Sequence, residues 1–459
     1  DPGGMMGILG RKVLLLAGDA VVVAGALYAA PLLRFGLLIE PGSLFVPSDL
    51  ATVFVYLVVF YLFDLYNLEE GFVSGAFIVR IALAVAVAAV LVGALFFLAR
   101  IPLYSLGIFL LQGALVFLFC AAWRCAYERL AKGTARPRRL AVLGAKEAGR
   151  TFGEMMRGNR DYEIVGYLDD DEATHGASVG CAPVLGGTDL LPDLVGEGKI
   201  DKVIIAAGDE VSPDVYRRLV QAKFAGVNVY ELPTFVEMTA GRIPVRHLSD
   251  TWLARVSIAG VRQTIYTKRL KRIGDIVVSL LLLIPAAPVI ALLCPLIRLD
   301  SPGPAVFRQA RIGLRGKPFT LYKLRTMVTG REGEREFAGR RDDPRVTRLG
   351  RILRLFRLDE LPQLFNVLKG DMSFIGPRAL MAEEVARFDG EIPYFSLRHA
   401  IRPGVTGWAQ VNYPHGATAE DALEKLQYDL YYLKNMSLLL DLHILLRTVR
   451  VVIFGKGAR

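Results

Sequence analysis

Cysteine and histidine are scarce in this sequence of 459 residues, which holds four cysteines and five histidines. Cys120, Cys125 and Cys294 lie in apolar runs and Cys181 in a loop-like stretch, so we expect reduced, buried thiols rather than a disulfide framework. The histidines form neither an HExxH pattern nor a Cys/His zinc spacing. A disulfide scaffold and a transition-metal site are therefore not expected.

Charged residues make up only 22% of the sequence, whereas apolar residues make up 53%. The apolar residues are concentrated in a few long runs, which excludes a disordered chain and a collagen-like fibre. The formal net charge of +10 indicates a nucleic acid or an anionic membrane surface as partner. The long apolar runs favour the membrane and its lipids, so we expect no nucleic-acid partner.

Four apolar runs in the first third of the chain each approach the roughly 20 residues that a helix needs to cross a bilayer. They are Val13–Leu33, Leu50–Tyr66, Ala76–Leu98 and Leu106–Tyr127. Basic residues precede the first run and follow the fourth, so both ends are expected in the cytoplasm. We predict a four-helix transmembrane bundle over residues 11–130. Asp19, Asp64 and Arg80 lie within or near these runs, where charges either serve a function or pair helices and snorkel.

The composition changes to that of a soluble α/β domain over residues 136–251. Strand-like runs alternate there with helical patterns, which predicts a Rossmann-like domain with a parallel sheet. The expected strands are Leu140–Leu143, Glu163–Leu168, Lys202–Ala207 and Asn228–Leu232. Gly144–Gly149 follows the first strand, where a Rossmann sheet holds a pyrophosphate, and Asp169–Asp171 stand at about the right distance for a ribose. Because Lys146 replaces the second glycine, we expect NAD to bind weakly or not at all, and a structural or regulatory role stays open.

A fifth apolar run, Ile276–Ile297, has basic residues on both sides. By the positive-inside rule, both of its ends are expected in the cytoplasm. Pro285 and Pro288 lie near its midpoint, and each removes a backbone donor and clashes with the preceding turn. Half of the run reaches only about 16 Å, roughly to the bilayer midplane. We therefore predict a re-entrant helix over residues 275–298 that breaks at these prolines; the alternative is a kinked fifth span.

Basic residues are dense between positions 298 and 360, where 16 Lys and Arg accompany eight acids. The segment ends in the adjacent carboxylates Asp359 and Glu360, with Pro362 two residues later. A reaction among phosphates on an anionic surface requires such a basic field. One acid of such a pair commonly holds a hard cation such as Mg²⁺, and the other can attack phosphorus. Taken alone, the pair is also typical of a helix start, where acids interact with the helix dipole.

Two loops rich in glycine and proline follow, GDMSFIGPR at 370–378 and RPGVTGWAQ at 402–410. Glycine permits close approach of backbone to a ligand, and guanidinium groups suit phosphate oxygens. Trp408 is suited to stack on a base or to anchor the domain at the bilayer interface. The basic field and the loops together supply the candidate substrate-binding residues: Lys323, Arg325, Arg354, Asp371, Arg378, Arg402 and Gln410.

Several long motifs give residues 268–459 a specific resemblance. They are YKLRTM at 322–327, LDELPQ at 358–363, GDMSFIGPR at 370–378 and PGVTGWAQVN at 403–412. Together they resemble the catalytic domain of the monotopic phosphoglycosyl transferases, also called bacterial sugar transferases. The whole chain resembles the larger members, in which four transmembrane helices and a Rossmann-like domain precede a mainly helical catalytic domain. Residues 252–267 are then a linker.

The resemblance implies an enzyme on the cytoplasmic face of the bacterial inner membrane. It would transfer a hexose 1-phosphate from a UDP-sugar to undecaprenyl phosphate and release UMP, the first membrane step of exopolysaccharide, capsule or O-antigen synthesis. The family's nucleophile maps onto Asp359, and its ligand for Mg²⁺, or Mn²⁺, maps onto Glu360. Its phosphate-binding residues map onto Arg354 and Arg378. The break of its re-entrant helix corresponds to Pro288.

The sequence departs from the family pattern at Ala379, where a proline usually follows the arginine. This departure bears on the rigidity of the loop or on the choice of sugar. UDP-glucose or UDP-galactose is the donor we expect, and a homodimer is expected as the commonest oligomer. A covalent phosphosugar-aspartate would let UMP leave before the lipid phosphate attacks, so ping-pong kinetics are expected.

Two other classes of protein share part of this pattern. A membrane-anchored nucleotide-sugar dehydratase or epimerase would need an intact GxGxxG and a Tyr-x-x-x-Lys pair in the C-terminal third, and the sequence has neither. A non-catalytic membrane scaffold would not need a carboxylate pair among ligand-like loops. Release of UMP from a UDP-sugar would exclude the scaffold.

Overall fold

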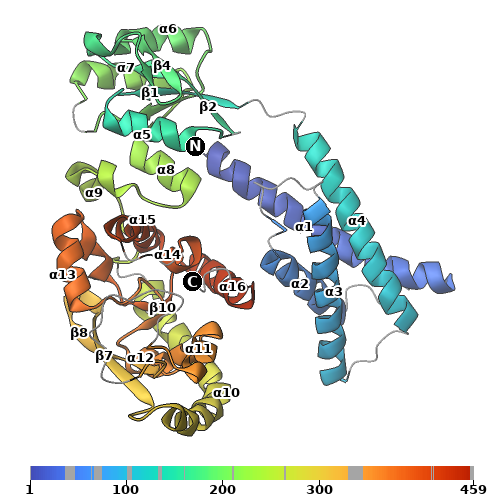
Figure 1. The fold of residues 1–459 in the computed structure, drawn as a ribbon. Helices are drawn as coiled ribbons and strands as arrows, with labels where there is room; N and C mark the ends of the chain where they lie inside the picture. The colour runs from blue at the N-terminus through green and yellow to red at the C-terminus, as the bar shows by residue number, and fades with distance from the viewer. Residues whose placement is uncertain are drawn as a thin grey trace. The chain divides into compact units, whose positions relative to one another are not determined.

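The structure is a computed structural model. It describes residues 2–36, 47–63, 65–66, 75–100, 106–132, 137–159, 161–208, 211–262, 265–328, 345–414, 416 and 418–454. The chain divides into two compact units, residues 1–138 with 158–163 and residues 139–157 with 164–459 (Figure 1). Asp64 and part of the basic field, residues 329–344, lie outside the described residues.

The first unit contains the predicted apolar helices, α1 (Pro2–Phe35), α2 (Pro47–Leu62), α3 (Gly75–Leu98) and α4 (Leu106–Lys132). Three of them hold segments long and apolar enough to cross a membrane, Lys12–Arg34, Phe77–Leu98 and Gly107–Arg129. Helix α2 has 16 residues. That is about 24 Å, less than the roughly 30 Å of a hydrocarbon core. Helix α2 therefore covers only part of the second predicted span, Leu50–Tyr66, because it ends at Leu62, before Leu65 and Tyr66.

One apolar core joins these four helices. Its buried members include Leu15 of α1, Phe60 of α2, Ala88 of α3 and Val116 of α4. Helix α1 contacts α2 and α4, and α3 contacts the same two helices. The apolar runs thus bury one face against each other and leave large apolar side chains on the outside, as lipid-facing helices do.

A buried ion pair lies within this core. The Arg124 guanidinium is 2.5 Å from the Asp19 carboxylate, and neither side chain is more than 1% exposed. Arg124 also donates to the carbonyl of Leu65 and lies 5.1 Å above the ring of Tyr66. Of the two roles left open for Asp19, the contacts support helix pairing, since the carboxylate joins α1 to α4.

The second unit begins with a six-stranded sheet of order β3-β4-β2-β1-β5-β6. The strands are β1 (Arg138–Leu143), β2 (Tyr162–Leu168), β3 (Ser178–Val179), β4 (Ala182–Gly186), β5 (Lys202–Ile205) and β6 (Asn228–Glu231). Strand β5 pairs in parallel with β1 and β6, and β4 pairs in parallel with β2. All four predicted strands are confirmed. The short hairpin of β3 and β4 was not predicted, and Cys181 in its turn is exposed rather than buried.

Helices α5 (Glu147–Met156), α6 (Leu191–Gly196), α7 (Pro213–Phe224) and α8 (Leu232–Ala240) accompany this sheet. The loop before α5 turns at Gly144, whose φ of +103° suits glycine. The Ala145 N–H in this loop donates to the Asp169 carboxylate over 2.7 Å. The Asp170 carboxylate accepts from the Thr188 N–H, also over 2.7 Å. The acids predicted to lie near a ribose therefore support the chain's own loops.

The C-terminal part of the second unit, the predicted catalytic domain, is mainly helical, as expected from the sequence. Its helices are α9 (Asp250–Arg255), α10 (Lys271–Asp300), α11 (Arg348–Leu355), α12 (Gln363–Lys369), α13 (Ala382–Glu391), α14 (Trp408–Asn412), α15 (Ala419–Asn435) and α16 (Leu438–Phe454). Its strands form two small sheets: β7 (Val306–Ile312) with β8 (Pro318–Leu324), and β9 (Ser373–Ile375) with β10 (Gly404–Thr406). Figure 1 shows the β7–β8 hairpin beside α12, which contacts β8.

Helix α10 is the fourth helix of the described chain that is long and apolar enough to cross a membrane. Helical backbone runs through Pro285, Pro288 and Pro295 without an interruption. The predicted helix-break-helix is therefore not seen as two separate helices. A proline removes one hydrogen bond and strains one turn, which the flanking turns of so long a helix can accommodate.

Residues before the predicted boundary at residue 268 also pack with the C-terminal part. Ile243, Val245 and Trp252 pack into its apolar core, although we placed two of them in the Rossmann-like domain and one in the linker. Trp408 lies at this junction. Its indole N–H donates to the carbonyl of Gly241 over 2.8 Å, and its ring stacks on Tyr431. These contacts give Trp408 a packing role rather than either predicted role.

Candidate active site

The two acids of the predicted dyad lie on a short turn between α11 and α12. Arg357 lies two residues beyond the end of α11 at Leu355 and has a φ of +57°, and a 3₁₀ turn over Leu358–Glu360 follows. A non-glycine residue in this left-handed region costs about 1–2 kcal/mol, so the surrounding packing must stabilise it. The turn leaves Asp359 only 9% exposed and Glu360 half-buried. The dyad is therefore held on a constrained turn, not on the first turn of a helix.

Lys323 of β8 faces both acids. Its Nζ is 3.0 Å from Oε1 of Glu360 and 3.9 Å from Oδ2 of Asp359. The guanidinium of Arg357 is 3.9 Å from the same oxygen of Glu360. Lys323 is 37 residues from Glu360 in the sequence. The fold thus brings one predicted substrate-binding residue onto both carboxylates.

The two carboxylates have different pKa shifts. Burial raises the pKa of Glu360, but the charges of Lys323, Arg378 and Arg357 outweigh burial and lower that pKa to about 2. Burial raises the pKa of Asp359, and the neighbouring Glu360 raises it further, against the opposing charges of Lys323 and two arginines. Glu360 is therefore firmly anionic at neutral pH, whereas Asp359 holds its charge in a less favourable environment.

Two predicted phosphate-binding arginines belong to the same electrostatic site. The charge of Arg354 lowers the pKa of Asp359, and the charge of Arg378 lowers that of Glu360. The Arg354 Nε–H donates to Thr326 Oγ1 over 2.9 Å, which orients the side chain from α11. Arg378 is half-buried in the loop after β9. The structure therefore brings Lys323, Arg354 and Arg378 together around the dyad.

Other predicted substrate-binding residues have different surroundings. Arg325 is 5% exposed, and its guanidinium donates to the carbonyls of Ile297, Ser301 and Pro302 at the end of α10. Asp371 pairs with Lys369 at 3.2 Å. These contacts give Arg325 and Asp371 local structural partners. The contacts of these two residues do not include the dyad, so their predicted roles in substrate binding stay predictions.

The second glycine-rich loop also lies apart from the dyad's contacts. The side-chain amide of Gln410 donates to the carbonyl of Val405, within its own loop. Arg402 lines a pocket of about 150 Å³ together with Lys271, Arg272 and Asp275. None of the residues that line this pocket belongs to the dyad or its cations. Substrate binding by Arg402 and Gln410 stays a prediction.

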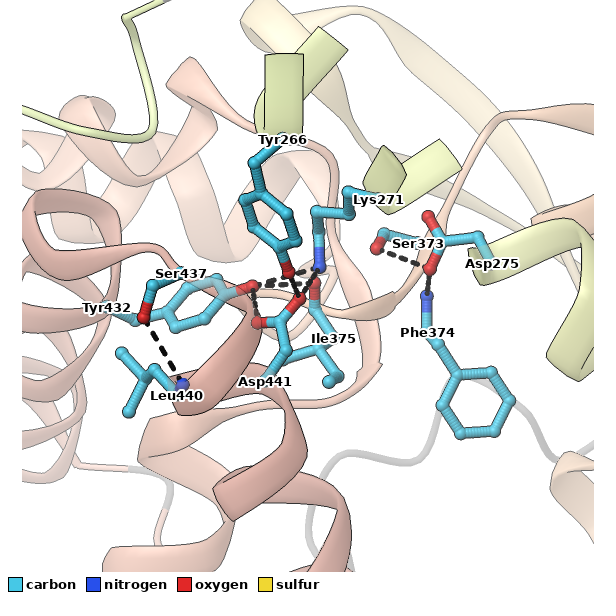
Figure 2. A network of polar contacts seen from close by, with 10 residues as sticks. All are labelled: Tyr266, Lys271, Asp275, Ser373, Phe374, Ile375, Tyr432, Ser437, Leu440 and Asp441. Atoms are coloured by element: carbon cyan, nitrogen blue, oxygen red, sulfur yellow. Dashed lines mark hydrogen bonds and ion pairs between the residues drawn. The ribbon is translucent and has the colours of Figure 1, made fainter. Parts of the chain in front are cut away.

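The first turns of α10 hold the segments that flank the site. Asp275 is 5% exposed and accepts hydrogen bonds from Ser373 Oγ (3.0 Å) and the Phe374 N–H (2.9 Å) of β9, as Figure 2 shows. Arg272 donates to the carbonyls of Val367 and Leu368 at the end of α12. Since α12 follows the dyad and β9 precedes Arg378, α10 braces both sides of the site.

A second set of contacts fixes α10 to the last two helices. Lys271 Nζ lies 2.6 Å from the Asp441 carboxylate and 3.0 Å from the hydroxyl of Tyr432, which itself donates to Asp441 over 2.6 Å. Figure 2 shows Tyr266 converging on the same carboxylate. Burying an ion pair is favourable only when additional hydrogen bonds satisfy it, as these hydroxyls do.

The dyad has the donor atoms that Mg²⁺ or Mn²⁺ prefers. Both side chains offer hard carboxylate oxygens, and the low pKa of Glu360 keeps that group anionic. Within the described residues, no three His, Cys, Asp or Glu side chains form a cluster. Mg²⁺ commonly binds through one or two carboxylates together with substrate phosphates, so Asp359 and Glu360 fit it.

One member of the site was not predicted. Arg357 is among the dense basic residues, but nothing in its own sequence position distinguishes it from its neighbours. Its spacing of three residues from Glu360 was the available signal, since a turn of this length brings such residues together.

Comparisons with known proteins identify relatives of this chain. Residues 266–455 match the family described as bacterial sugar transferase, and residues 61–233 match a family described as a CoA-binding domain. A UDP-glucose:undecaprenyl-phosphate glucose-1-phosphate transferase of Klebsiella pneumoniae is 32% identical over 70% of this chain and 69% of the relative. This chain belongs to the bacterial sugar transferase family. Its four apolar N-terminal helices fit the family's large form.

Two further relatives of this bacterial sugar transferase have other sugars in their names. A UDP-N-acetylgalactosamine-undecaprenyl-phosphate N-acetylgalactosaminephosphotransferase of Aeromonas hydrophila is 39% identical over 58% of this chain and 62% of the relative. An undecaprenyl-phosphate galactose phosphotransferase of Salmonella typhimurium is 30% identical over 65% of this chain and 64% of the relative. The chain thus spans a little under two thirds of the length of these two relatives.

Proposed function

We propose that this protein transfers a hexose 1-phosphate from a UDP-sugar to undecaprenyl phosphate. The observation that carries the proposal is the carboxylate pair of buried Asp359 and half-buried Glu360, which faces Lys323 and is acted on by the charges of three arginines, Arg354, Arg357 and Arg378. Anionic phosphates are attracted by such a cluster of fixed cations. The names of the three relatives support the same reaction class.

In the first step, an Asp359 carboxylate oxygen attacks the β-phosphorus of the UDP-sugar. A new P–O bond forms to the aspartate while the bond to the α-phosphate oxygen breaks, so UMP leaves with that electron pair. The sugar 1-phosphate is then covalently attached to Asp359. Lys323 and Arg354, whose charges act on Asp359, offset the repulsion between the carboxylate and the diphosphate.

In the second step, a phosphate oxygen of undecaprenyl phosphate attacks the same phosphorus. The P–O bond to Asp359 breaks, which releases undecaprenyl-diphosphate-sugar and regenerates the carboxylate. Glu360 would hold Mg²⁺ or Mn²⁺. Such an ion supplies positive charge against the phosphate oxygens. Because the donor product can leave before the lipid phosphate attacks, we expect ping-pong kinetics.

The sugar is the part of this proposal that the relatives leave open, since their names contain glucose, galactose and N-acetylgalactosamine. Our expectation from the sequence is glucose or galactose. The product would begin the synthesis of an exopolysaccharide, capsule or O-antigen.

We also propose that α10 enters and leaves the membrane on the cytoplasmic face. Near its start, Asp275 is bound to β9, and near its end, Leu293 and Ile297 pack with Leu353 of α11. Both ends therefore contact one catalytic domain, whereas large apolar side chains between them, such as Ile284, are exposed. A straight helix of 30 residues is about 45 Å long and would separate its ends across a bilayer.

The function is tested by incubating the membrane-embedded full chain with undecaprenyl phosphate, Mg²⁺ and each of a panel of UDP-sugars. UMP release with UDP-glucose or UDP-galactose, and transfer of sugar phosphate to the lipid, is the expected result. Absence of UMP release from every UDP-sugar would exclude the function and favour the non-catalytic scaffold.

The topology is tested in a variant without native cysteines that carries Lys369→Cys, an exposed position of the catalytic domain. In intact cells this cysteine should be shielded from a membrane-impermeant thiol reagent. Changing Pro285 and Pro288 to leucine should straighten α10, expose the reporter and abolish activity. Labelling of the reporter in the chain with both prolines would invert the proposed orientation.

A further inference from the structure

The loop that carries Arg378 is held by two buried or half-buried arginines rather than by regular secondary structure. Arg398 Nη2 donates to the carbonyl of Arg378 over 3.2 Å, and Arg311 Nη1 donates to the carbonyl of Ala379 over 3.3 Å. The Ile312 N–H also donates to the carbonyl of Leu380 over 2.9 Å. Ala379 lacks the fixed φ of a proline. The loop therefore depends on these outside donors for its conformation.

Arg398 is fixed in turn by a carboxylate on another element. It lies on a 3₁₀ helix, Phe395–Ala400, and its guanidinium is 2.7 Å from the Asp429 carboxylate of α15. The two side chains are only 5% and 2% exposed. The guanidinium also lies 5.2 Å above the ring of Phe395. A buried planar guanidinium with these partners has one orientation available, so its contact with the Arg378 carbonyl is well defined.

We propose that Arg398 and Asp429 are positioning residues, which hold the loop of Arg378 in the conformation that presents its guanidinium to the phosphates of the UDP-sugar. The inference rests on the proposed function, because it takes Glu360 and Arg378 as parts of the transferase site. Asp429 orients Arg398, Arg398 fixes the backbone of Arg378, and the guanidinium of Arg378 faces the substrate phosphates. The catalytic role stays with the dyad and Arg378, since neither Arg398 nor Asp429 has a contact with the acids.

The alternative role of the Arg398–Asp429 ion pair is purely structural, as a link between the 3₁₀ helix and α15. The two roles differ in what a substitution changes. A structural link would lower the melting temperature and the fraction of active enzyme, which reduces kcat and leaves KM unchanged. A positioning role changes how the UDP-sugar is bound, so KM rises and kcat falls together, and the change depends on Arg378.

Arg398→Lys is the variant that separates these roles. A lysine keeps the positive charge beside Asp429, but it lacks the planar guanidinium, held over the Phe395 ring, whose Nη2 reaches both the carboxylate and the Arg378 carbonyl. We expect kcat/KM for UMP release to fall about tenfold, with a higher KM and a lower kcat. Asp429→Asn, which keeps the shape of the side chain, should cause a loss of the same kind.

The decisive measurement is a double-mutant cycle with Arg378→Gln, using the full chain in membranes. If Arg398 acts through Arg378, then Arg398→Lys causes little further loss in the Arg378→Gln background. An equal loss in both backgrounds would overturn the inference. Asp429→Asn, measured in the same two backgrounds, gives the answer if Arg398→Lys fails to fold.

Arg242→Lys is the matched control. Arg242 pairs with Glu424 of the same helix α15 at 2.5 Å, and its contacts are with a different segment from the Arg378 loop. It should leave kcat/KM unchanged. Wild-type activity in Arg398→Lys, with UMP release intact, would refute positioning and leave the proposed function standing. Absence of UMP release by the unmodified chain would refute both.

Discussion

Two runs of neighbouring acids look alike in the sequence but have opposite environments in the fold. Asp169 and Asp170 of the Rossmann-like domain accept hydrogen bonds from backbone N–H groups of their own domain. Asp359 and Glu360 of the catalytic domain instead face the ammonium of Lys323 and nearby guanidinium groups. Carboxylates whose partners are backbone amides support loops, whereas carboxylates that face cationic side chains lie beside groups that can also bind a phosphate.

Substitutions in the two runs of acids should differ most in their effect on the rate of UMP release. Asp359→Asn should reduce UMP release at least a thousandfold, because an amide cannot act as the anionic nucleophile. Covalent labelling by a UDP-sugar that carries radiolabel in its β-phosphate should disappear as well.

Asp371→Asn is the control for this change, since Asp371 is a nearby acid with local partners. It should retain labelling and most of the activity. Turnover near the wild-type rate in Asp359→Asn would refute the assignment of the nucleophile.

The second prediction concerns the metal ion. Activity should require Mg²⁺ or Mn²⁺, and Glu360→Gln should lower kcat/KM about a hundredfold or more, because the change removes the ligand charge that hard cations prefer. UMP release is measured after EDTA treatment and after adding each metal back. Full activity in EDTA would disprove a metal requirement. The positive charge at Asp359 and Glu360 would then come from the protein's own Lys and Arg side chains alone.

The third prediction uses the pH dependence of the first step. The nucleophile acts as a carboxylate, so activity is lost as pH falls through the pKa of Asp359. Lys323 lowers that pKa; removing its charge with Lys323→Met should raise the pKa and move the acidic limb to higher pH. The limb is measured as single-turnover UMP release at saturating UDP-sugar. An unchanged limb would mean that Lys323 does not control the ionisation of Asp359.

The smallest effect on activity is expected in the Rossmann-like domain. Asp169→Ala leaves the N–H of Ala145, a residue only 5% exposed, without its partner. Unfolding of this domain should become about 1–3 kcal/mol easier, while the rate of UMP release stays the same. Denaturant titration followed by a probe in this domain measures the change. A large loss of UMP release would show that the reaction at Asp359 depends on the Rossmann-like domain.

Local patterns predicted much of the fold. Four of the six strands of the Rossmann-like sheet lie where runs such as Lys202–Ala207 predicted them, because a buried parallel strand needs a short apolar run. The sequence also indicated the dyad and the apolar character of α10. It did not predict the hairpin of β3 and β4, whose residues are too few for a clear period, or the uninterrupted helix through Pro285 and Pro288.

The candidate site was predictable only in part, because its members come from separate elements. Arg325 and Lys323 stand two positions apart in one motif, yet Lys323 faces the dyad while Arg325 is buried against the end of α10. Both side chains carry the same charge, so composition could not separate them. Their environments differ because β8 ends at Leu324: Lys323 belongs to the strand, whereas Arg325 follows it.

The sequence by itself determined the family, the apolar helices and the acidic pair, since each is written in consecutive residues or in a short periodic pattern. Only the tertiary structure decided which cations surround Asp359 and Glu360. Lys323 comes from β8, and Arg378 comes from a loop that Arg398 and Arg311 hold. Electrostatic interactions depend on distance and burial, so the pKa of about 2 at Glu360 arises from residues that lie apart in the sequence and meet only in the folded chain.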